Sequence, residues 1–384
     1  QQAADDTSSA KTDSVRFKKH TLTTEFFSEG VAVGDVNQDG NVDVMAGAYW
    51  YQGPDWKRQE IFPAKPFDGA KEYSNSFLNF SMDVNQDGWI DFIVIDFPGT
   101  LSYWYENPKR EFFNHWKKRF VFERIKGESP PFADVNRDGH PEIVAHWQNH
   151  WGLIQHDPAD ATKPWTFRAI TGEDKWEQFY HGTGIGDLNS DGRPDLLLNE
   201  GWYEQPALRD AQWIRHEFKF GNKGGAQMFA YDVNGDGQND VITALDGHAW
   251  GLAWFEAQRE NGRLTFRKHT LMGDRSEESK YGVACSHPHA LDLADLDGDG
   301  LKDIIVGKRL WAHGPKGDVE PDAAPVLYWF QLQRNSRGAA SFVPQLVDDN
   351  SGVGVQVTAR DVNGDNRPDI LTVSKLGAFV FFNE

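Results

Sequence analysis

Short apolar runs recur along the chain, separated by polar loops. Seven of them have a common form, three or four residues with no charged residue among them. They lie at residues 44–46, 92–95, 143–145, 196–198, 241–243, 304–306 and 370–372. Runs this short, bounded by turn residues, are typical of β-strands that are buried on both faces.

Each apolar run is the second of four predicted strands. A strand such as residues 31–34 precedes it, on the other side of a polar loop. An aromatic strand follows it, at residues 49–51, 103–105, 202–203, 254–255, 328–330 and 380–382. The fourth strand alternates basic and apolar residues, as in residues 56–61 and 116–121, and its charged side is expected at the solvated edge of a sheet. The pattern therefore predicts an all-β chain of four-stranded units.

The polar loop between the first two strands occurs seven times, at intervals of 45 to 66 residues. Repeats of about this length with several short strands are typical of propeller blades, so we predict one seven-bladed β-propeller over residues 15–384. The seventh unit ends after its third strand. Residues 16–22 closely match residues 265–271, the fourth strand of the fifth unit. We therefore expect an N-terminal strand, about residues 15–22, to complete the last blade and close the ring.

The polar loop carries a fixed pattern of oxygen-bearing side chains. In the first copy, residues 35–43, Asp or Asn occupies positions 1, 3, 5 and 9, and Gly40 occupies position 6. These side chains, with the backbone carbonyl of position 7, supply the oxygen ligands that Ca²⁺ prefers. An EF-hand is not indicated, because position 12 has no glutamate and strands flank the loop. We predict up to seven structural calcium sites; the alternative is a set of Asx-type turns without metal.

The predicted calcium ligands are the residues at positions 1, 3, 5, 7 and 9 of the seven loops. They are Asp35, Asn37, Asp39, Asn41, Asp43, Asp83, Asn85, Asp87, Trp89, Asp91, Asp134, Asn136, Asp138, His140, Glu142, Asp187, Asn189, Asp191, Arg193, Asp195, Asp232, Asn234, Asp236, Gln238, Asp240, Asp295, Asp297, Asp299, Leu301, Asp303, Asp361, Asn363, Asp365, Arg367 and Asp369. The seventh loop has Asn366 in place of the turn glycine, and Asn tolerates the left-handed conformation required there.

Composition narrows the expected partners and compartment. The formal net charge is -19 and no basic stripe is present, so neither nucleic acid nor an anionic membrane is an expected partner. The one cysteine, Cys285, cannot form an intramolecular disulfide. No run of about 20 apolar residues exists, so no membrane span is predicted. Residues 1–14 are interpreted as a disordered leader of a mature secreted chain after removal of a signal peptide, and the calcium loops agree with export.

The repeats resemble FG-GAP repeats, also called VCBS repeats, over about residues 15–384. The resemblance implies a seven-bladed propeller with calcium in its loops, as in the heads of integrin α-subunits and in many secreted bacterial proteins. A weaker similarity, carried by residues 289–300 and 307–311, is to the propeller of aldos-2-ulose dehydratase and related secreted bacterial proteins. It implies dehydration or isomerisation of a sugar, although no sequence is left for the cupin domains that accompany that enzyme's propeller.

The candidate site is expected on the face opposite the calcium loops. The residue six positions before each loop begins an inner strand near the axis, and Glu29, Glu128, His181 and His289 occupy four of these positions. His287 lies two residues before His289, which predicts the same side of the strand. Seven of the 13 histidines fall on this face: His146, His150, His181, His248, His287, His289 and His313.

Acids, bases and aromatic rings that converge at a propeller mouth suit chemistry on a sugar. Elimination or isomerisation needs a base, an acid for the leaving group and a cation for the developing enolate. We predict His181 or His289 as the base, Tyr180 as the acid and Lys308 or Arg309 as the cation, with His287 beside them. The predicted substrate-binding residues are Glu29, Glu128, His146, Trp147, His150, Glu200, His248, Trp250, Trp311 and His313. Alternatively, His181, His287 and His289 bind a second divalent metal.

Two functions stay open at this point. One is a secreted carbohydrate-active enzyme, a carbon–oxygen lyase of the sugar dehydratase or polysaccharide lyase type, or an isomerase. The other is a non-catalytic, calcium-stabilised propeller that binds a glycan or a protein through the same face. The density of histidines favours the enzyme, because recognition alone rarely needs titratable groups. The oligomeric state is not predicted.

Overall fold

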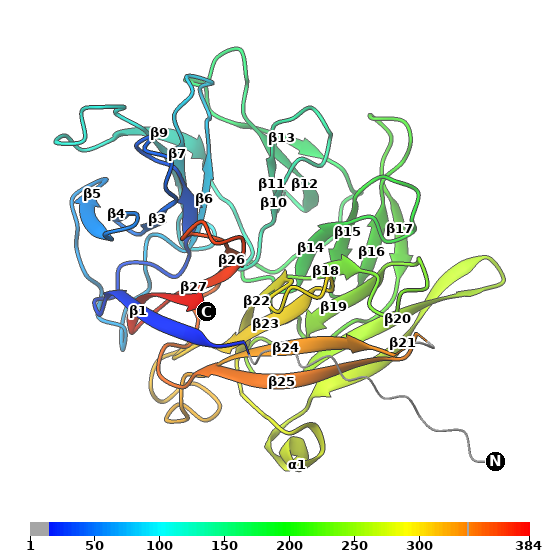
Figure 1. Ribbon diagram of the computed structural model, residues 1–384. Helices are drawn as coiled ribbons and strands as arrows, with labels where there is room; N and C mark the ends of the chain where they lie inside the picture. The colour runs from blue at the N-terminus through cyan, green and yellow to red at the C-terminus, as the bar shows by residue number, and fades with distance from the viewer. Residues whose placement is uncertain (1–14, 336–337) are drawn as a thin grey trace.

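The computed structural model describes residues 15–335 and 338–384, and the predicted leader, residues 1–14, lies outside them. The described strands form seven four-stranded antiparallel sheets arranged around a central axis (Figure 1). The predicted all-β, seven-bladed propeller is confirmed.

Each blade uses four strands, and in blades 1 to 6 they follow chain order from the axis outward. The strands are β2 (Ala32–Gly34), β3 (Asp43–Ala46), β4 (Tyr49–Gln52) and β5 (Lys57–Glu60) in blade 1; β6 (Leu78–Met82), β7 (Asp91–Ile95), β8 (Ser102–Glu106) and β9 (Lys117–Phe122) in blade 2; β10 (Phe132–Ala133), β11 (Glu142–Trp147), β12 (His150–Gln155) and β13 (Thr166–Ala169) in blade 3; β14 (Thr183–Gly186), β15 (Asp195–Leu198), β16 (Gly201–Glu204) and β17 (Ile214–Glu217) in blade 4; β18 (Phe229–Tyr231), β19 (Asp240–Ala244), β20 (Leu252–Glu260) and β21 (Arg263–Met272) in blade 5; β22 (Pro288–Ala294), β23 (Asp303–Lys308), β24 (Leu327–Arg334) and β25 (Ala340–Asp348) in blade 6; and β26 (Val357–Arg360), β27 (Asp369–Ser374), β28 (Gly377–Asn383) and β1 (Phe17–Thr23) in blade 7.

The ring is closed by pairing between the two ends of the described chain. β1 runs antiparallel to β28, with Phe17 opposite Asn383 and His20 opposite Val380. In Figure 1 the blue β1 lies beside the red strands of the C-terminal blade. The predicted closing strand is therefore confirmed, at Phe17–Thr23 rather than at about 15–22. Because β1 covers the outer edge of β28, that edge is not left open for pairing with another chain.

The hydrophobic core is divided among the interfaces between neighbouring blades. Val44 and Leu371, for example, belong to a buried cluster that joins blades 1 and 7, and Ile93 and Ile154 belong to one that joins blades 2 and 3. Strands such as β3 and β7 are fully buried because both of their faces pack against other blades, as their unbroken apolar runs predict. No blade therefore completes its core before its neighbours are in place.

Amide side chains bridge the inner strands around the axis. Gln227 donates from Nε2 to the carbonyl of Val355 at 2.8 Å and accepts from the N–H of Leu291 at 2.9 Å. Gln356 donates to the carbonyl of Asn79 at 3.1 Å and accepts from the N–H of the same residue at 3.1 Å. Residues of the inner strands β6, β10, β14, β18, β22 and β26 line a cavity of about 300 Å³ between them. These bonds fix the strands whose first residues form the mouth.

Two long connections distinguish blade 6. The connection into the blade carries the 3-10 helix η1 (Arg275–Glu277) and the helix α1 (Glu278–Tyr281), and residues 309–326 connect β23 to β24. Arg275 pairs with Glu320 at 2.7 Å, so the two connections are joined above the blade. Across the described ranges, no helix has the length and apolar character needed to cross a membrane.

Candidate metal centre

The seven polar loops hold their carboxylates in place with backbone donors. In the first loop, Asp35 accepts the N–H groups of Asp39 at 3.1 Å and Gly40 at 3.0 Å. Two loops bring three carboxylate oxygens within 4.8 Å of one another: Asp134, Asp138 and Glu142 in one, and Asp295, Asp297 and Asp299 in the other. Oxygens gathered at this spacing suit a hard cation such as Ca²⁺.

The carboxylate at the ninth loop position also joins the loop to its blade through backbone hydrogen bonds. This role was not predicted from the sequence. Asp43 accepts the N–H groups of Val36 and Gly53, each at 2.8 Å, and is fully buried. Equivalent pairs of bonds are made by Asp91, Asp195, Asp240, Asp303 and Asp369. Burial raises the pKa of Asp91 to about 7. A nearby cation would favour the charged form of these carboxylates.

Two loops carry a side-chain cation of their own. Arg193 pairs with Asp191 and donates from Nε to the carbonyl of Gln205, and Arg367 pairs with Asp365 in the same way at 2.8 Å. Both arginines occupy position 7 and both carboxylates occupy position 5. In the fourth and seventh loops the guanidinium group would therefore compete with a metal ion for a predicted ligand.

Replacing Arg193 by Leu, the residue that the sixth loop has at this position, is expected to raise the Ca²⁺ affinity of the fourth loop severalfold. An exposed ion pair contributes up to about 1 kcal/mol, which limits the gain to less than about tenfold. Isothermal titration with Ca²⁺ measures the change. Arg124→Leu, at an exposed arginine outside the loops, is the control. Unchanged or weaker binding in Arg193→Leu would contradict competition by the guanidinium.

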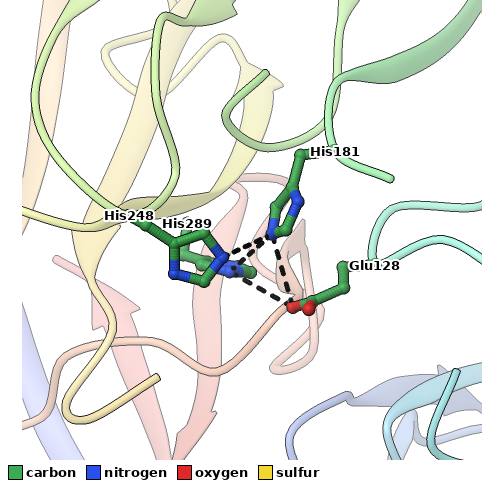
Figure 2. Close-up of side chains that lie close together, drawn as sticks. All are labelled: Glu128, His181, His248 and His289. Carbon is green, nitrogen blue, oxygen red and sulfur yellow. Dashed lines mark hydrogen bonds and ion pairs between the residues drawn. The ribbon is translucent and has the colours of Figure 1, made fainter. Parts of the chain in front are cut away.

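Four side chains converge at the opposite mouth (Figure 2). Glu128 precedes β10, His181 precedes β14, His248 lies between β19 and β20, and His289 lies in β22. Their ligand atoms all lie within 4.8 Å of one another. Nε2 of His181 is 2.9 Å from Nε2 of His248 and 3.3 Å from Nε2 of His289. Oε2 of Glu128 is 3.5 Å from Nε2 of His181 and 3.3 Å from Nε2 of His289.

The repeat register accounts for three members of this cluster. Glu128, His181 and His289 each precede a loop by six residues, and the structure brings them together as predicted. His248 enters from the turn after β19, where Gly247 allows close approach: a Cβ there would lie 2.6 Å from the carbonyl oxygen of Gly225. The fourth ligand position thus comes from a turn rather than from the repeat register.

The protonation states of the cluster leave lone pairs free for a metal. Burial, together with the neighbouring His289 and His181, lowers the pKa of His248 to about 2. Burial and the charge of Arg309 lower the pKa of His289 to about 3, so both imidazoles are neutral at pH 7. Burial opposes ionisation of Glu128, but His181, His289 and Arg309 outweigh it and hold the pKa of its carboxyl well below its usual range.

A divalent transition metal fits this donor set. Three imidazole nitrogens that face one another cannot all be satisfied by donating to each other, whereas one cation would accept the lone pair of each. Three imidazoles and a carboxylate are typical ligands of Zn²⁺ and related metals, while Ca²⁺ takes six to eight oxygens. His181, His248, His289 and Glu128 are therefore the residues that would hold such an ion.

Arg309 joins the cluster to a second carboxylate. Its guanidinium donates to Glu128 Oε2 at 2.9 Å and to Glu29 Oε1 at 2.6 Å, and Nη1 lies 3.1 Å from Nε2 of His289. Glu29 and Arg309 are almost fully buried. Arg309 was predicted to stabilise an enolate, but its Nη1 and Nη2 donate to these two carboxylates, and the geometry assigns it to positioning Glu128.

His287 lies outside the cluster, although its spacing predicted the same side of the strand as His289. β22 begins only at Pro288, its register shifts between Pro288 and Ala290, and His287 has a φ of 55°. These features break the alternation of side chains. Nε2 of His287 lies 3.5 Å from Oδ1 of Asp318 instead. The predicted metal-binding set was His181, His287 and His289. In the structure, His248 and Glu128 lie with His181 and His289, and His287 does not.

Lys308 also points away from the mouth cluster. It is buried, and its Nζ donates to Ser286 Oγ at 2.6 Å. Its predicted contact with a developing enolate is therefore not supported by its position. The adjacent Arg309 points the other way because successive side chains of a strand alternate between faces.

A cavity of about 530 Å³ opens beside the cluster and includes His181 and His248 in its lining. Tyr180 and Glu200 form part of its wall: the Tyr180 hydroxyl donates to Glu200 and accepts the N–H of Asn199 at 3.1 Å. Burial and the Glu200 carboxylate raise the pKa of Tyr180 well above its ordinary value, so its hydroxyl stays protonated. Both residues thus lie in the wall of this cavity.

The remaining predicted residues surround this region. His146 is buried with its ring 5.1 Å from that of Trp151, and Trp147 packs against Phe122 and Phe167 between blades. His150 hydrogen-bonds through Nδ1 to the carbonyl of Thr171 at 2.9 Å.

The last three predicted residues lie in or near the long connections of blade 6. Trp250 stacks under Arg275, and Trp311 donates to the carbonyl of Pro321. His313 contacts Asp318. Asp318 was not predicted, because it lies in a connection that does not follow the repeat. The length of that connection, residues 309–326, was the one sign in the sequence that it could carry a functional residue.

Known proteins share the repeat and the fold. The family described as FG-GAP-like repeat matches residues 83–145 and 232–306. Integrin alpha pat-2 of Caenorhabditis elegans is 25% identical over 293 residues, covering 62% of this chain and 24% of that protein. Integrin alpha-PS3 of Drosophila melanogaster is 27% identical over 164 residues, covering 37% of this chain and 14% of that protein. The chain thus spans about a quarter or less of the length of these relatives.

A solved structure supports the fold. The extracellular domain of a hybrid two-component system from B. thetaiotaomicron superposes with a TM-score of 0.51 at 15% identity, over 94% of this chain and 41% of that one. At this identity the likeness concerns the fold alone. Together with the seven observed blades, these similarities support a seven-bladed β-propeller that carries FG-GAP-like repeats.

Proposed function

We propose that this propeller is a metal-dependent carbohydrate-active enzyme, a carbon–oxygen lyase or isomerase that works at the mouth opposite the polar loops. The observation that carries the proposal is the convergence of three imidazole nitrogens and one carboxylate oxygen within 4.8 Å. The cavity of about 530 Å³ beside them supports it, because it is large enough for a sugar ring.

The residues around the cavity suit this chemistry. A divalent ion held by the cluster would supply a Lewis acid that polarises a carbonyl oxygen bound to it in addition to the four protein ligands. Trp176 contributes an aromatic ring to the cavity wall, against which the C–H face of a sugar can pack. The hydrogen-bonded pair of Tyr180 and Glu200 gives this wall a carboxylate that can accept a hydrogen bond from a substrate hydroxyl. Arg309 keeps Glu128 ionised and oriented.

We further propose that the polar loops bind Ca²⁺ and that the protein acts outside the cell. The gathered loop oxygens support the first point. The similarity to integrin α chains and to an extracellular domain supports the second, in agreement with sites that need extracellular calcium concentrations.

The proposed activity is tested with Zn²⁺-loaded protein and a panel of 2-keto sugars and uronate oligosaccharides. We expect a product with a conjugated double bond, detected by ultraviolet absorbance, or an isomerised sugar, detected by NMR. The double variant His181→Ala/His289→Ala should lose turnover, whereas His269→Ala, a half-buried histidine in the outer strand β21, should keep it. Full turnover in the double variant would refute a reaction at this centre.

The similarity to integrin α chains favours a second candidate, a non-catalytic propeller that binds a glycan or a protein through the same mouth. This function predicts saturable binding to an immobilised glycan or protein without any product. Binding that survives in the double variant while no sugar of the panel is converted would favour it over the enzyme.

A further inference from the structure

We propose that His313 and Asp318 form the proton-transfer dyad of this mouth, with His313 as the catalytic base and Asp318 as its positioning residue. The inference rests on the proposed function. It assigns the proton transfer to a residue outside the metal cluster, in the long connection between β23 and β24.

The dyad has the geometry of an oriented imidazole. Oδ1 of Asp318 lies 2.9 Å from the backbone nitrogen of His313 and 3.1 Å from its Nδ1. A carboxylate at this distance keeps the proton on Nδ1 and leaves the lone pair on Nε2. The Asp318 side chain is 1% exposed and that of His313 is 55% exposed. Within the described residues, Nε2 of His313 has no hydrogen-bond partner, so it is free to meet a ligand.

The dyad lies next to the metal cluster. The ring centroid of His313 is 4.6 Å from that of His248, which itself lines the cavity. A base here would act on an atom close to a carbonyl oxygen that an ion held by the cluster would polarise. The position is therefore suitable for removing a proton from the carbon beside a carbonyl group.

The surrounding contacts hold the connection firmly. Tyr73 donates to the carbonyl of Ala312, Ser286 donates to that of Val319 at 3.1 Å, and Arg275 pairs with Glu320. The same oxygen, Oδ1 of Asp318, also lies 3.5 Å from Nε2 of His287, and the side chains of Asp318 and His287 are both 1% exposed. A buried, charged carboxylate in this place stabilises the imidazolium that forms when His313 accepts a proton.

The other candidate bases are engaged elsewhere. The Nε2 atoms of His181, His248 and His289 face one another, and a bound metal would use their lone pairs. The Tyr180 hydroxyl is held between Glu200 and Asn199. His313 is therefore the proposed base, in place of His181 or His289.

The proposed elimination needs no oxidant, reductant or other added reagent. Nε2 of His313 takes the proton from the carbon next to the carbonyl, and the electron pair of that C–H bond forms the new C=C bond. The hydroxyl group on the following carbon leaves with the electron pair of its C–O bond. The imidazolium of His313 returns the proton to this hydroxide, which is released as water, and the imidazole is restored.

The test compares wild type, His313→Ala, Asp318→Asn and the control Lys316→Gln, an exposed residue of the same connection. All are loaded with Co²⁺ and checked for metal content, visible absorption and melting temperature. Proton abstraction is followed by NMR in D₂O as deuterium entry beside the carbonyl of D-fructose and of each 2-keto sugar that the wild type converts. We expect His313→Ala to lose about 100-fold or more of this rate, with an unchanged Co²⁺ spectrum.

Added imidazole separates a catalytic role from a structural one. It should restore part of the rate to His313→Ala and less to the double variant His313→Ala/Asp318→Asn, in which nothing orients the added base. A wild-type-like rate in His313→Ala with full metal content would overturn the dyad and leave the metal-dependent function standing. No exchange or conversion by the metal-loaded wild type would overturn both.

Discussion

Replacing His248 by Ala should lower the affinity of the mouth for Co²⁺ and Zn²⁺ by more than about 100-fold. His248 offers one of the four ligand atoms that lie within 4.8 Å of one another. Loss of even an outer partner of a metal ligand commonly costs about 10- to 100-fold in affinity, and loss of a ligand itself costs more. The site would keep two imidazoles and Glu128, with water in the fourth position.

Equilibrium dialysis and the visible spectrum of bound Co²⁺ measure this change. His248 is half-buried in a turn rather than in a strand, so the variant is expected to fold, and its melting temperature in Ca²⁺ checks this. His150→Ala is the matched control, because His150 is also half-buried in the mouth region, and the one hydrogen bond that its side chain makes within the described residues is to a backbone carbonyl. Unaltered metal binding by His248→Ala would exclude the four-residue centre.

Adding EGTA in excess should lower the melting temperature by about 10 °C or more. A site filled at 100 times its dissociation constant adds about 2.7 kcal/mol to stability. Five of the seven loops have no arginine at position 7 and are expected to bind most tightly. For a chain of this size, one kcal/mol corresponds to about 1–2 °C. Loss of several ions therefore gives a shift that is large enough to measure.

Differential scanning calorimetry with and without EGTA tests this expectation. Ca²⁺ added back should restore the transition, whereas Zn²⁺ should not. The variant His248→Ala should show the same shift as the wild type, because the loops and the mouth lie on opposite faces. An unchanged transition in EGTA would mean that the loops hold their shape through the backbone bonds of residues such as Asp35 and Asp43 alone.

Much of the fold could be predicted because it follows from local features that repeat along the sequence. Apolar runs such as residues 92–95 predicted the buried second strands, and the match of residues 16–22 with residues 265–271 predicted the closing strand. The spacing of six residues before each loop placed Glu128, His181 and His289 at one mouth. Each of these inferences depends only on regular strands and a constant repeat.

The positions of site residues were predicted less well where the chain departs from the regular repeat. His287 was assigned to the wrong side of its strand because the register shift at Pro288 has no clear mark in the sequence. Lys308 and Arg309 could not be told apart, since both follow the same apolar run. Asp318 was missed because it lies in a long connection, whose path depends on contacts such as Arg275 with Glu320.

The sequence by itself determined the seven blades, the ring closure, the predicted metal loops and the face that carries the histidines. These features depend on local periodicity, which can be recognised in each repeat from its own residues. Only the tertiary structure decided that His248 completes a cluster with Glu128, His181 and His289, and that His313 is oriented by Asp318. Those contacts join residues from different blades and irregular connections, so their geometry exists only once the ring has closed and the connections have packed above it.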